Sequence, residues 1–313
     1  MIDNIKVRKR INESEKLAIL NMADPGKINL SGDGVHKSAM IKNISINWRQ
    51  DYMHLAVSLP TFKYGHNLYP LKYASINDVI SEIESTLGLH LKDAHLGRID
   101  VSQNFIVKDP CAFYFDSLLY KDKFYTHEYK HGKSFLNSEN SATLAFYDKI
   151  EQFKKDRTKL NDIKLIPEFE NKNILRYEYR MTQRLGRVLG RNEVLVKDLY
   201  DKNLYNSLIG IWLSQYLSII KRKEEIVNRG FKLPSELKDY LAFTGATKLG
   251  GESTIKKKII LLRKQKKFRN EAQPNRMIKM VGDLFKTGYL CRENEHVKEL
   301  NSKVTGAALM NYA

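Results

Sequence analysis

Cysteine is almost absent from this sequence of 313 residues. Cys111 and Cys291 are the only two, and they lie far apart and outside any Cys-x-x-Cys spacing. A disulfide framework and a cysteine-based zinc site are therefore excluded, and a reducing cytoplasm is the expected compartment. Residues 1–4 include an acid and lack the apolar stretch of a secretory signal, which agrees with that expectation.

Three other patterns are missing. The most apolar run, residues 204–220, is interrupted by Asn206, Ser207, Ser214 and Gln215, which suits a core helix better than a membrane span. The phosphate-binding pattern Gly-x-x-x-x-Gly-Lys-Ser/Thr does not occur, so nothing indicates ATP use. No His-x-His pair occurs either, so a metal held by such a pair is not indicated.

Acidic residues are clearly outnumbered by basic ones. The chain has 53 Lys and Arg against 36 Asp and Glu, a net charge of +17, and an isoelectric point near 9.6. Such an excess attracts polyanions, and counterion release favours binding to a phosphate backbone. A merely soluble basic protein and one that docks on an anionic membrane are the alternatives. No convincing amphipathic or spanning element supports a membrane, so no membrane partner is expected.

The first two-thirds of the chain alternate short strand-like runs with a few helices. The hydrophobic content of 42% is enough for a real core. We predict strands over 44–48, 53–59, 97–105 and 174–181, a weaker strand over 68–74, and a hairpin of 133–137 and 142–149 that turns at 138–141. We predict helices near 111–120 and over 77–87, the latter with Ser75 as its cap and Gly88 as its stop.

Helical periodicity dominates beyond about residue 190, over 194–198, 204–227, 235–243 and 255–269. The sequence therefore predicts an α+β fold. Residues 1–190 would form an antiparallel-sheet domain with flanking helices, and residues 191–313 a mostly helical, basic region.

Three predicted strands each carry polar groups on one face and apolar groups on the other, because side chains two residues apart share a face. Tyr147 and Lys149 share one face of the strand over 142–149. The other two strands contribute Arg98 and Asp100, and Arg176, Glu178 and Arg180. An antiparallel sheet could gather these groups on one wet face.

These groups are chemically coherent as a phosphoryl-transfer site. A tyrosine hydroxyl is a weak nucleophile at neutral pH unless positive charge, from a lysine or a metal, stabilises the phenolate. Two carboxylates from separate strands commonly hold Mg²⁺ or Mn²⁺. The plainer explanations are that a strand tyrosine, one of 17, is packing, and that Arg-x-Asp or Arg-x-Glu is a surface ion pair.

Three short motifs in this order resemble a known signature. Residues 97–102 read Gly-Arg-Ile-Asp-Val-Ser, residues 144–151 Leu-Ala-Phe-Tyr-Asp-Lys-Ile-Glu, and residues 175–180 Leu-Arg-Tyr-Glu-Tyr-Arg. They are similar to the replication initiators of filamentous phages, the gene II type, and of staphylococcal rolling-circle plasmids. The similarity extends upstream to Met1-Ile2-Asp3 and Tyr69-Pro70, and covers roughly residues 1–190.

The resemblance implies a role for each motif. Tyr147 would be the nucleophile, with Lys149 stabilising charge, and Asp100 and Glu178 would bind Mg²⁺ or Mn²⁺. Family members often have an acid five residues after the tyrosine, whereas Glu151 lies four after it, so Glu151 is a candidate third ligand that departs from the pattern. Arg98, Arg176 and Arg180 would grip phosphate or orient the acids.

A basic segment follows in the helical half. Ile255, Ile259 and Leu262 provide an apolar stripe for docking on the body of the protein. We predict that the basic side chains of this segment contact the DNA backbone, although a solvated helix is the simpler alternative. They are Lys256, Lys257, Lys258, Arg263, Lys264, Lys266, Lys267 and Arg269.

The resemblance therefore implies a rolling-circle replication initiator that nicks and rejoins one DNA strand in a bacterial host cytoplasm. Its partners would be origin DNA, double- and single-stranded, and the host replication helicase and polymerase, and it could act as a homodimer. A relaxase or transposase with the same chemistry and a non-enzymatic origin-binding or copy-control protein are the alternatives.

Overall fold

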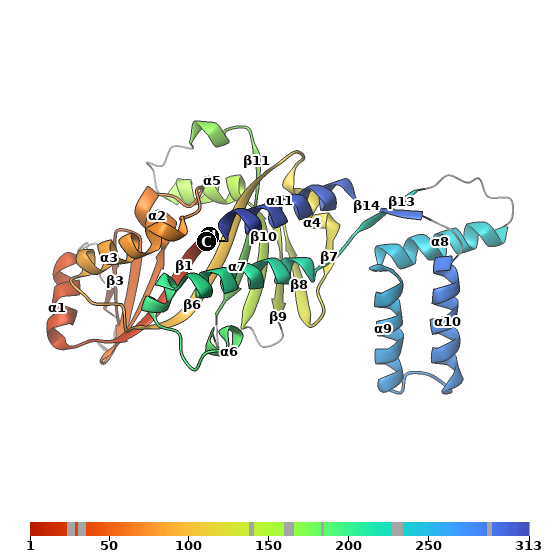
Figure 1. Cartoon of the computed structure of the whole chain (residues 1–313), viewed down its shortest axis with the longest axis horizontal. Coiled ribbons are helices and arrows are strands. Elements are labelled where there is room, and N and C mark those ends of the chain that lie inside the picture. The colour runs from red at the N-terminus through yellow and green to blue at the C-terminus, as the bar shows by residue number, and fades with distance from the viewer. Residues whose placement is uncertain are drawn as a thin grey trace. The chain divides into compact units, whose positions relative to one another are not determined.

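The computed structural model describes residues 1–23, 29–30, 36–137, 141–159, 166–182, 185–226, 234–286 and 290–312. The chain divides into two compact units (Figure 1). The first, here called the sheet unit, comprises Met1–Cys111, Lys123–Ser218 and Lys303–Ala313. The second, the helical unit, comprises Ala112–Asp122 and Ile219–Ser302.

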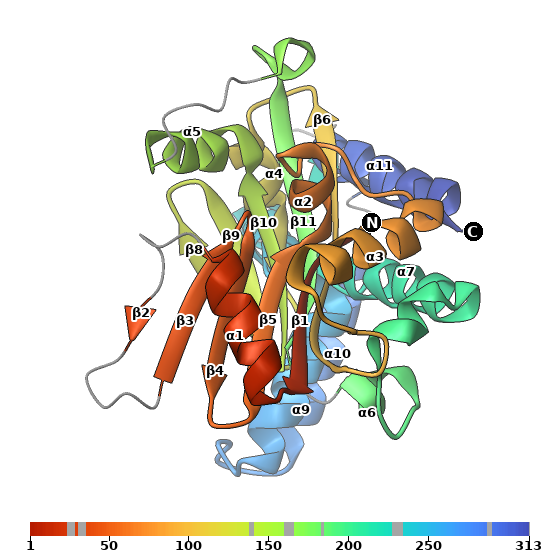
Figure 2. The same cartoon turned by 90° about the vertical axis from the view of Figure 1, so that its left-hand side faces the viewer.

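The sheet unit is built on a ten-stranded sheet with the order β2-β3-β4-β5-β1-β6-β11-β10-β9-β8 (Figure 2). Every pairing in it is antiparallel. The strands are β1 (Ile2–Arg10), β2 (Asn29–Leu30), β3 (His36–Ile41), β4 (Ile44–Arg49), β5 (Tyr52–Ser58), β6 (His95–Val107), β8 (Phe124–Tyr129), β9 (Gly132–Asn137), β10 (Ala142–Asp148) and β11 (Asn173–Met181). The predicted α+β fold class is confirmed.

One face of the central strands packs against helix α7 (Lys202–Leu217) through a stack of aromatic rings. The Phe146 and Tyr177 rings lie 4.6 Å apart between centroids, and Trp212 of α7 stacks on Tyr177 at 4.9 Å. The Tyr177 hydroxyl also donates to the Trp212 carbonyl oxygen at 3.0 Å. All three rings are buried, and large aromatic areas of this kind dominate core energetics. The stack fixes which face of β10 and β11 remains for chemistry.

The other helices of the sheet unit have clear local causes. In α3 (Ile76–Leu87) the buried side chains recur at helical spacing, and Gly88, with φ of 62°, ends the helix in the left-handed conformation that glycine tolerates. Helix α1 (Glu13–Met22) starts from a capping box between Asn12 and Glu15. The remaining elements are α2 (Leu59–Tyr64), α5 (Lys149–Lys159), α6 (Leu185–Leu189), and the 3₁₀ turns Tyr73–Ser75, Pro167–Phe169 and Val196–Tyr200.

The helical unit contains α8 (Pro234–Lys248), α9 (Gly251–Lys264) and α10 (Ala272–Lys286), with α9 and α10 side by side. Two small antiparallel sheets complete it: β7 (Leu118–Tyr120) with β12 (Ile220–Lys221), and β13 (Lys223–Ile226) with β14 (Leu290–Glu293). Helices α4 (Cys111–Ser117) and α11 (Glu295–Asn311) each contain residues of both units. No helix in the described ranges is long and apolar enough to cross a membrane.

Several local predictions differ from the structure. Residues 68–72 form no strand but a connection that leads into the 3₁₀ turn Tyr73–Ser75. Helix α7 ends at Leu217 rather than at 227, and the chain then enters β12 and β13. The hairpin of β9 and β10 forms as predicted, but most of its turn, residues 138–140, lies outside the described residues.

The boundary between the two units also falls elsewhere than the predicted residue 190. The sheet unit extends to Ser218 because α7 packs its apolar side on the sheet. Residues from Lys303 onward belong to the sheet unit again. Helical periodicity identified α7 correctly as a helix. Periodicity alone does not tell on which body a helix packs.

Candidate active site

The three predicted motifs lie on three neighbouring central strands, β10, β11 and β6. In the register of the sheet Tyr147 is opposite Arg176, and Asp100 is opposite Arg180. Glu178 lies in the row between these two pairs, where it is opposite Ala145 of β10 and Ser102 of β6. Tyr147, Glu178 and Asp100 therefore share one face of the sheet, opposite the aromatic stack, as strand alternation predicts.

Glu178 is the centre of this group. Its Oε1 accepts hydrogen bonds from the Tyr147 hydroxyl at 2.5 Å and from Nε of Arg176 at 2.6 Å. Its Oε2 accepts one from Nε of Arg180 at 2.7 Å, and the Arg180 guanidinium forms an ion pair with the same oxygen at 2.6 Å. The sequence predicted a solvent-exposed face, but Glu178 and Asp100 are both buried. Guanidinium groups, and not solvent, bind their carboxylate oxygens.

The electrostatics of the pair follow from this burial. Burial alone would raise the pKa of Glu178, but the charges of Arg176 and Arg180 and the hydrogen bonds to the carboxylate outweigh it and hold that pKa far below its usual range. Burial raises the pKa of the Tyr147 phenol well above its usual value. Arg176 opposes this rise and the neighbouring Glu178 charge adds to it. At rest the phenol is therefore protonated and the carboxylate ionised.

Arg176 anchors the network and is itself only 2% exposed. Its guanidinium forms a buried ion pair with Asp3 of β1 and donates to the Ser102 hydroxyl at 2.7 Å. It also donates to the Asn104 side-chain oxygen at 3.0 Å and to the Asn67 carbonyl oxygen at 3.1 Å. Arg176 thus orients acids and binds backbone inside the protein, which is one of the two roles predicted for it, and its burial argues against the other, contact with DNA.

Asp100 is held separately by Arg98. Nε of Arg98 donates to one carboxylate oxygen at 2.7 Å and its terminal nitrogen to the other at 2.6 Å, a bidentate pair. Burial raises the pKa of Asp100 to about 6. Arg98 lowers it in part, and the Glu178 charge raises it further. The Arg98 and Arg180 side chains are 24% and 34% exposed, so both could still reach a phosphate.

The Tyr-Asp-Lys sequence marks the point where β10 becomes α5. Asp148 accepts hydrogen bonds from the backbone N–H groups of Ile150 and Glu151 at 2.9 and 3.0 Å, which caps the start of the helix. Lys149 therefore does not lie on the strand face as predicted. It is the first residue of α5, and its buried ammonium lies 5.9 Å from the centre of the Tyr147 ring and 2.7 Å from Oε1 of Gln152.

Residues 7–198 match the family model of the N-terminal part of the gene II replication-associated protein. The chain belongs to this family. The match includes all three motif strands and ends within the 3₁₀ turn Val196–Tyr200. A comparison with curated proteins finds no match. The solved structure of a rolling circle replication initiator protein from Geobacillus stearothermophilus is similar at 11% identity, with 79% of this chain and 96% of that chain covered and a TM-score of 0.38.

Glu151 of this gene II-family chain stays apart from the cluster. It lies in the first turn of α5, where its carboxylate pairs with Lys154 at 3.0 Å, and this hydrogen bond lowers its pKa. In the described parts of the chain, Asp, Glu, His and Cys side chains nowhere form a group of three that could hold a metal ion. Because arginines occupy the oxygens of Asp100 and Glu178, the donors in this arrangement do not fit a bound Mg²⁺ or Mn²⁺.

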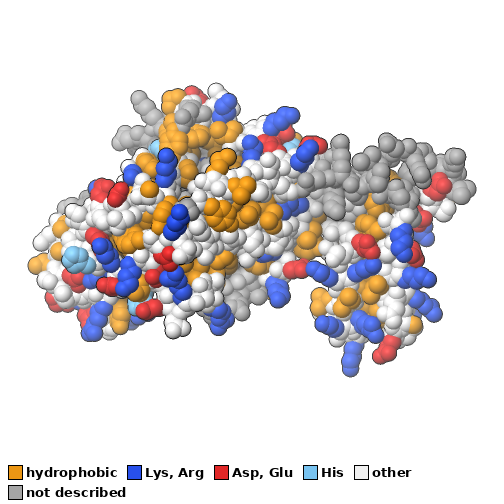
Figure 3. Space-filling view, viewed as in Figure 1, with side chains coloured by type: hydrophobic (Ala, Val, Ile, Leu, Met, Phe, Trp, Pro, Cys, Tyr) orange, Lys and Arg blue, Asp and Glu red, His pale blue; other side chains and the backbone are white. Residues whose placement is uncertain are grey.

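The predicted DNA-binding segment of this family member lies in the helical unit. Helix α9 ends at Lys264, so the last three predicted contacts, Lys266, Lys267 and Arg269, lie in the turn before α10. Most of the basic side chains are exposed, and Figure 3 shows Lys and Arg along the surface of α9 and α10. Two have acidic partners: Lys256 pairs with Glu252 at 2.6 Å and Lys257 with Asp122 at 3.3 Å.

Four contributors to the cluster were not predicted as site residues: Asp3, Asn67, Ser102 and Asn104. Asp3 belongs to the N-terminal stretch that shares the family resemblance, so a signal for it exists in the sequence. Asn67 acts through its carbonyl oxygen, which any residue possesses, and no sequence pattern could reveal this contact.

Proposed function

We propose that this protein initiates rolling-circle replication by nicking one strand of origin DNA with Tyr147 and later rejoining the ends. The observation that carries the proposal is the hydrogen bond from the Tyr147 hydroxyl to a buried, arginine-held Glu178 in a chain of the gene II family. A structural tyrosine would satisfy its hydroxyl equally well with a carbonyl oxygen or water. Here it is paired with an ionised carboxylate, which orients the hydroxyl and can take its proton as the bond to phosphorus forms.

In the proposed reaction the Tyr147 oxygen attacks the phosphorus of one phosphodiester while its proton passes to Glu178. An O–P bond to Tyr147 forms and the bond from phosphorus to the 3′ oxygen breaks. The 3′ oxygen takes a proton from solvent and leaves as a free hydroxyl, and the 5′ end remains on Tyr147. The phosphotyrosine diester replaces one phosphodiester by another, so rejoining requires no ATP.

Positive charge around the phenol opposes the high pKa of Tyr147. Arg176 and Arg180 lie on the same face, and Lys149 lies over the tyrosine ring. Electrostatic stabilisation by fixed charges of this kind is usually the largest contribution to catalysis of phosphoryl transfer. Arg98 and Arg180, which are partly exposed, are the groups we assign to the incoming phosphate.

A divalent metal remains a separate proposal. Mg²⁺ or Mn²⁺ would add positive charge at the phosphate, with Asp100 and Glu178 as its first candidate ligands and Glu151 as a more distant one. Since arginines hold both nearer carboxylates, the ion would have to displace guanidinium contacts. The steps above do not depend on it.

The expected partners follow from the products. A free 3′-hydroxyl is a primer for the host polymerase, and the host helicase would separate the strands from the nick. The exposed basic side chains of α9 and of the turn after it would hold the origin duplex, as a monomer or a homodimer.

The test is to incubate the protein with a labelled single strand of its own origin and to look for a protein–DNA complex that survives boiling in detergent. The proposal expects such a complex, together with a released fragment that a polymerase can extend. Intact DNA, or cleavage that leaves no label on the protein, would contradict it.

A further inference from the structure

A tyrosine-lined pocket of the sheet unit lies beside the candidate active site, and we propose that it binds unpaired bases of the DNA strand presented to Tyr147. The inference rests on the proposed nicking function and names the part of the substrate that this second site would hold. The pocket has a volume of about 630 Å³, enough for a nucleobase with its sugar.

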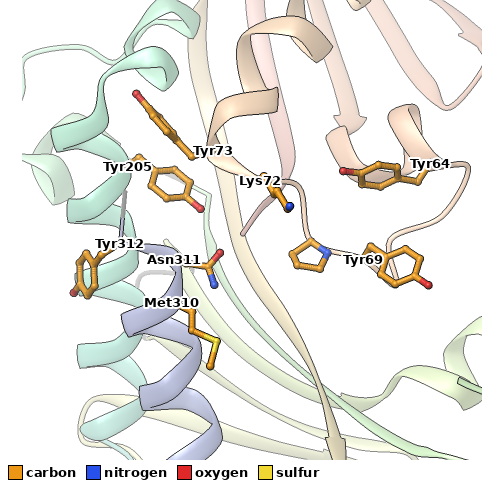
Figure 4. A pocket seen from close by; sticks show the side chains of 9 residues that line it. Tyr64, Tyr69, Lys72, Tyr73, Tyr205, Met310, Asn311 and Tyr312 are labelled. Carbon is orange, nitrogen blue, oxygen red and sulfur yellow. The ribbon is translucent and has the colours of Figure 1, made fainter. Parts of the chain in front are cut away.

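The walls of the pocket come from three segments far apart in the sequence, as Figure 4 shows. Tyr64 and Tyr69 lie on one side and Tyr73 and Tyr205 on the other, with Lys72 between them. The end of α11 contributes Tyr312 and the neighbouring Met310. Hydrophobic side chains also gather over α11 and beside α7 in Figure 3.

Several of these rings offer exposed surface. Tyr64, Tyr69 and Tyr312 are 36%, 37% and 43% exposed, and large aromatic side chains are usually much more buried. The row of rings continues outside the pocket, because Tyr69 lies 5.3 Å from His66 and 5.4 Å from Phe169 between centroids. Exposed aromatic faces in a row are the platform on which the bases of a single strand stack.

The charge of the pocket also favours a nucleotide of a DNA strand as its ligand. Among the described residues that line it, Lys72 is the only charged one, and no carboxylate is present. Its ammonium is exposed and forms no ion pair within the described structure. Aromatic faces with one free cation suit a nucleotide, which offers a flat base and a phosphate.

The pocket is mechanically tied to the candidate active site. The Asn104 side chain donates to the carbonyl oxygens of Asn67 and Leu68 at 2.9 and 2.7 Å, and Arg176 donates to Asn67. Tyr69 follows directly and lines, together with Arg176, a second small cavity. The network that holds Glu178 thus also fixes the segment that carries Tyr69, which places one wall of the pocket next to the arginines of the candidate site.

The experiment compares a strand with bases to one without them. All proteins carry Tyr147→Phe, so that only binding is measured. The probes are a fluorescent oligothymidine of about 20 nucleotides and an abasic strand with the same number of phosphates. The protein with Tyr147→Phe alone should favour the strand with bases by about tenfold or more, since the stacking of a single base contributes about this much. Backbone contacts elsewhere affect both probes alike and cancel in the ratio.

Tyr64→Leu combined with Tyr69→Leu should remove most of this preference and leave the affinity for the abasic strand unchanged. Tyr312→Leu, on a different segment, should reduce it as well, which guards against a local folding defect in the double variant. The matched control is Tyr125→Leu on β8, where the tyrosine is 65% exposed and outside the pocket. This control should keep the full preference.

Two results would overturn the proposal. One is equal affinity of the protein with an intact pocket for the two probes, and the other is an unchanged preference for the strand with bases in both pocket variants. Its failure can be told from failure of the nicking function. If the protein with Tyr147 forms a covalent complex and the pocket variants keep their preference for the strand with bases, only the proposed role of the pocket is refuted. A protein that shows the predicted base preference and forms no covalent complex refutes only the nicking step.

Discussion

The Tyr147 hydroxyl lies 2.5 Å from Oε1 of Glu178, on a face of the sheet from which the aromatic core is excluded. The two residues come from neighbouring strands and one row apart, so the hydrogen bond crosses diagonally between β10 and β11. It joins a phenol with a raised pKa to a carboxylate with a lowered pKa. Such a pair keeps the Tyr147 phenol protonated until a phosphate is bound beside it.

Glu178→Gln is expected to slow nicking by about a hundredfold or more, because the amide cannot accept the phenol proton. It also leaves Arg176 and Arg180 without their shared anion, and loss of one partner of a buried ion pair costs roughly 3–5 kcal/mol of stability. Single-turnover nicking should therefore be measured at a temperature where circular dichroism shows the variant folded. Glu82→Gln, which removes an exposed carboxylate, is the control. A folded Glu178→Gln that nicks at the wild-type rate would remove the proton acceptor from the mechanism.

Asp100 should make stability depend on pH in a defined window. Its pKa is about 6 in the folded chain against ~3.9 in an unfolded one, so the folded protein binds more protons between about pH 4 and 6. The free energy of unfolding therefore falls as pH rises through this window and levels off above it. Relative to Asp100→Asn, which cannot titrate, the wild type should gain up to about 3 kcal/mol between pH 7.5 and 4. Urea unfolding of both proteins across this range tests it, and a constant difference would mean that Asp100 titrates normally.

The proposed nicking steps do not require a divalent metal, whereas binding of an ion by Asp100 and Glu178 would make nicking stop on metal removal and resume with Mg²⁺ or Mn²⁺. The arrangement of Arg98 adds a sharper expectation. Because Arg98 occupies both oxygens of Asp100, Arg98→Ala should lower the metal concentration needed for half-maximal rate, even if the maximal rate falls. A titration of wild type and variant after treatment with EDTA measures this. Undiminished nicking in excess EDTA would leave the arginines and Lys149 as the source of positive charge at the site.

The basic turn at the end of α9, from Lys264 to Arg269, should contribute to DNA binding through the phosphate backbone alone. Affinity falls with salt by a slope of about −0.9 per phosphate contact on duplex DNA and about −0.7 on a single strand. Neutralising four exposed side chains should weaken binding and flatten the slope by up to about three to four units. The four are Lys264, Lys266, Lys267 and Arg269.

Sequence preference should change little in that variant, because backbone contacts position a protein without reading bases. Nicking of a concentrated single strand should also persist. A charge-matched control neutralises four exposed lysines of the sheet unit. They are Lys92, Lys108, Lys172 and Lys202. Parallel salt titrations of the basic-turn variant and the wild type would show that the turn is simply solvated.

The site strands could be predicted from sequence because each largely alternates between core residues and polar residues. Tyr177 and Phe146 face the core, and their neighbours Glu178 and Tyr147 face the site. Strand β1 was missed, since four basic residues between Lys6 and Arg10 obscure its alternation of Ile5 and Val7. The prediction that Lys149 lies on the strand was wrong because the alternation of polar residues continues to Lys149, whereas Asp148 ends the strand and caps helix α5.

Burial of the site could not be predicted in the same way. Alternation places Arg176 on a polar face, but its burial comes from contacts with Asp3 and the backbone of Asn67, which are distant in sequence. The same holds for the tyrosine pocket, whose walls meet only in the folded chain. Its tyrosines lie in no common motif.

The most direct test of the account is to identify the residue that carries the DNA. After reaction with a labelled origin strand and nuclease trimming, trypsin should place the residual nucleotide on the peptide of residues 134–149, whose only tyrosine is Tyr147. Tyr147→Phe should form no adduct while its binding to the strand is retained, because only one oxygen is lost. A nucleotide on the peptide of residues 177–180, which contains Tyr177 and Tyr179, or an adduct that persists in Tyr147→Phe, would contradict the central claim.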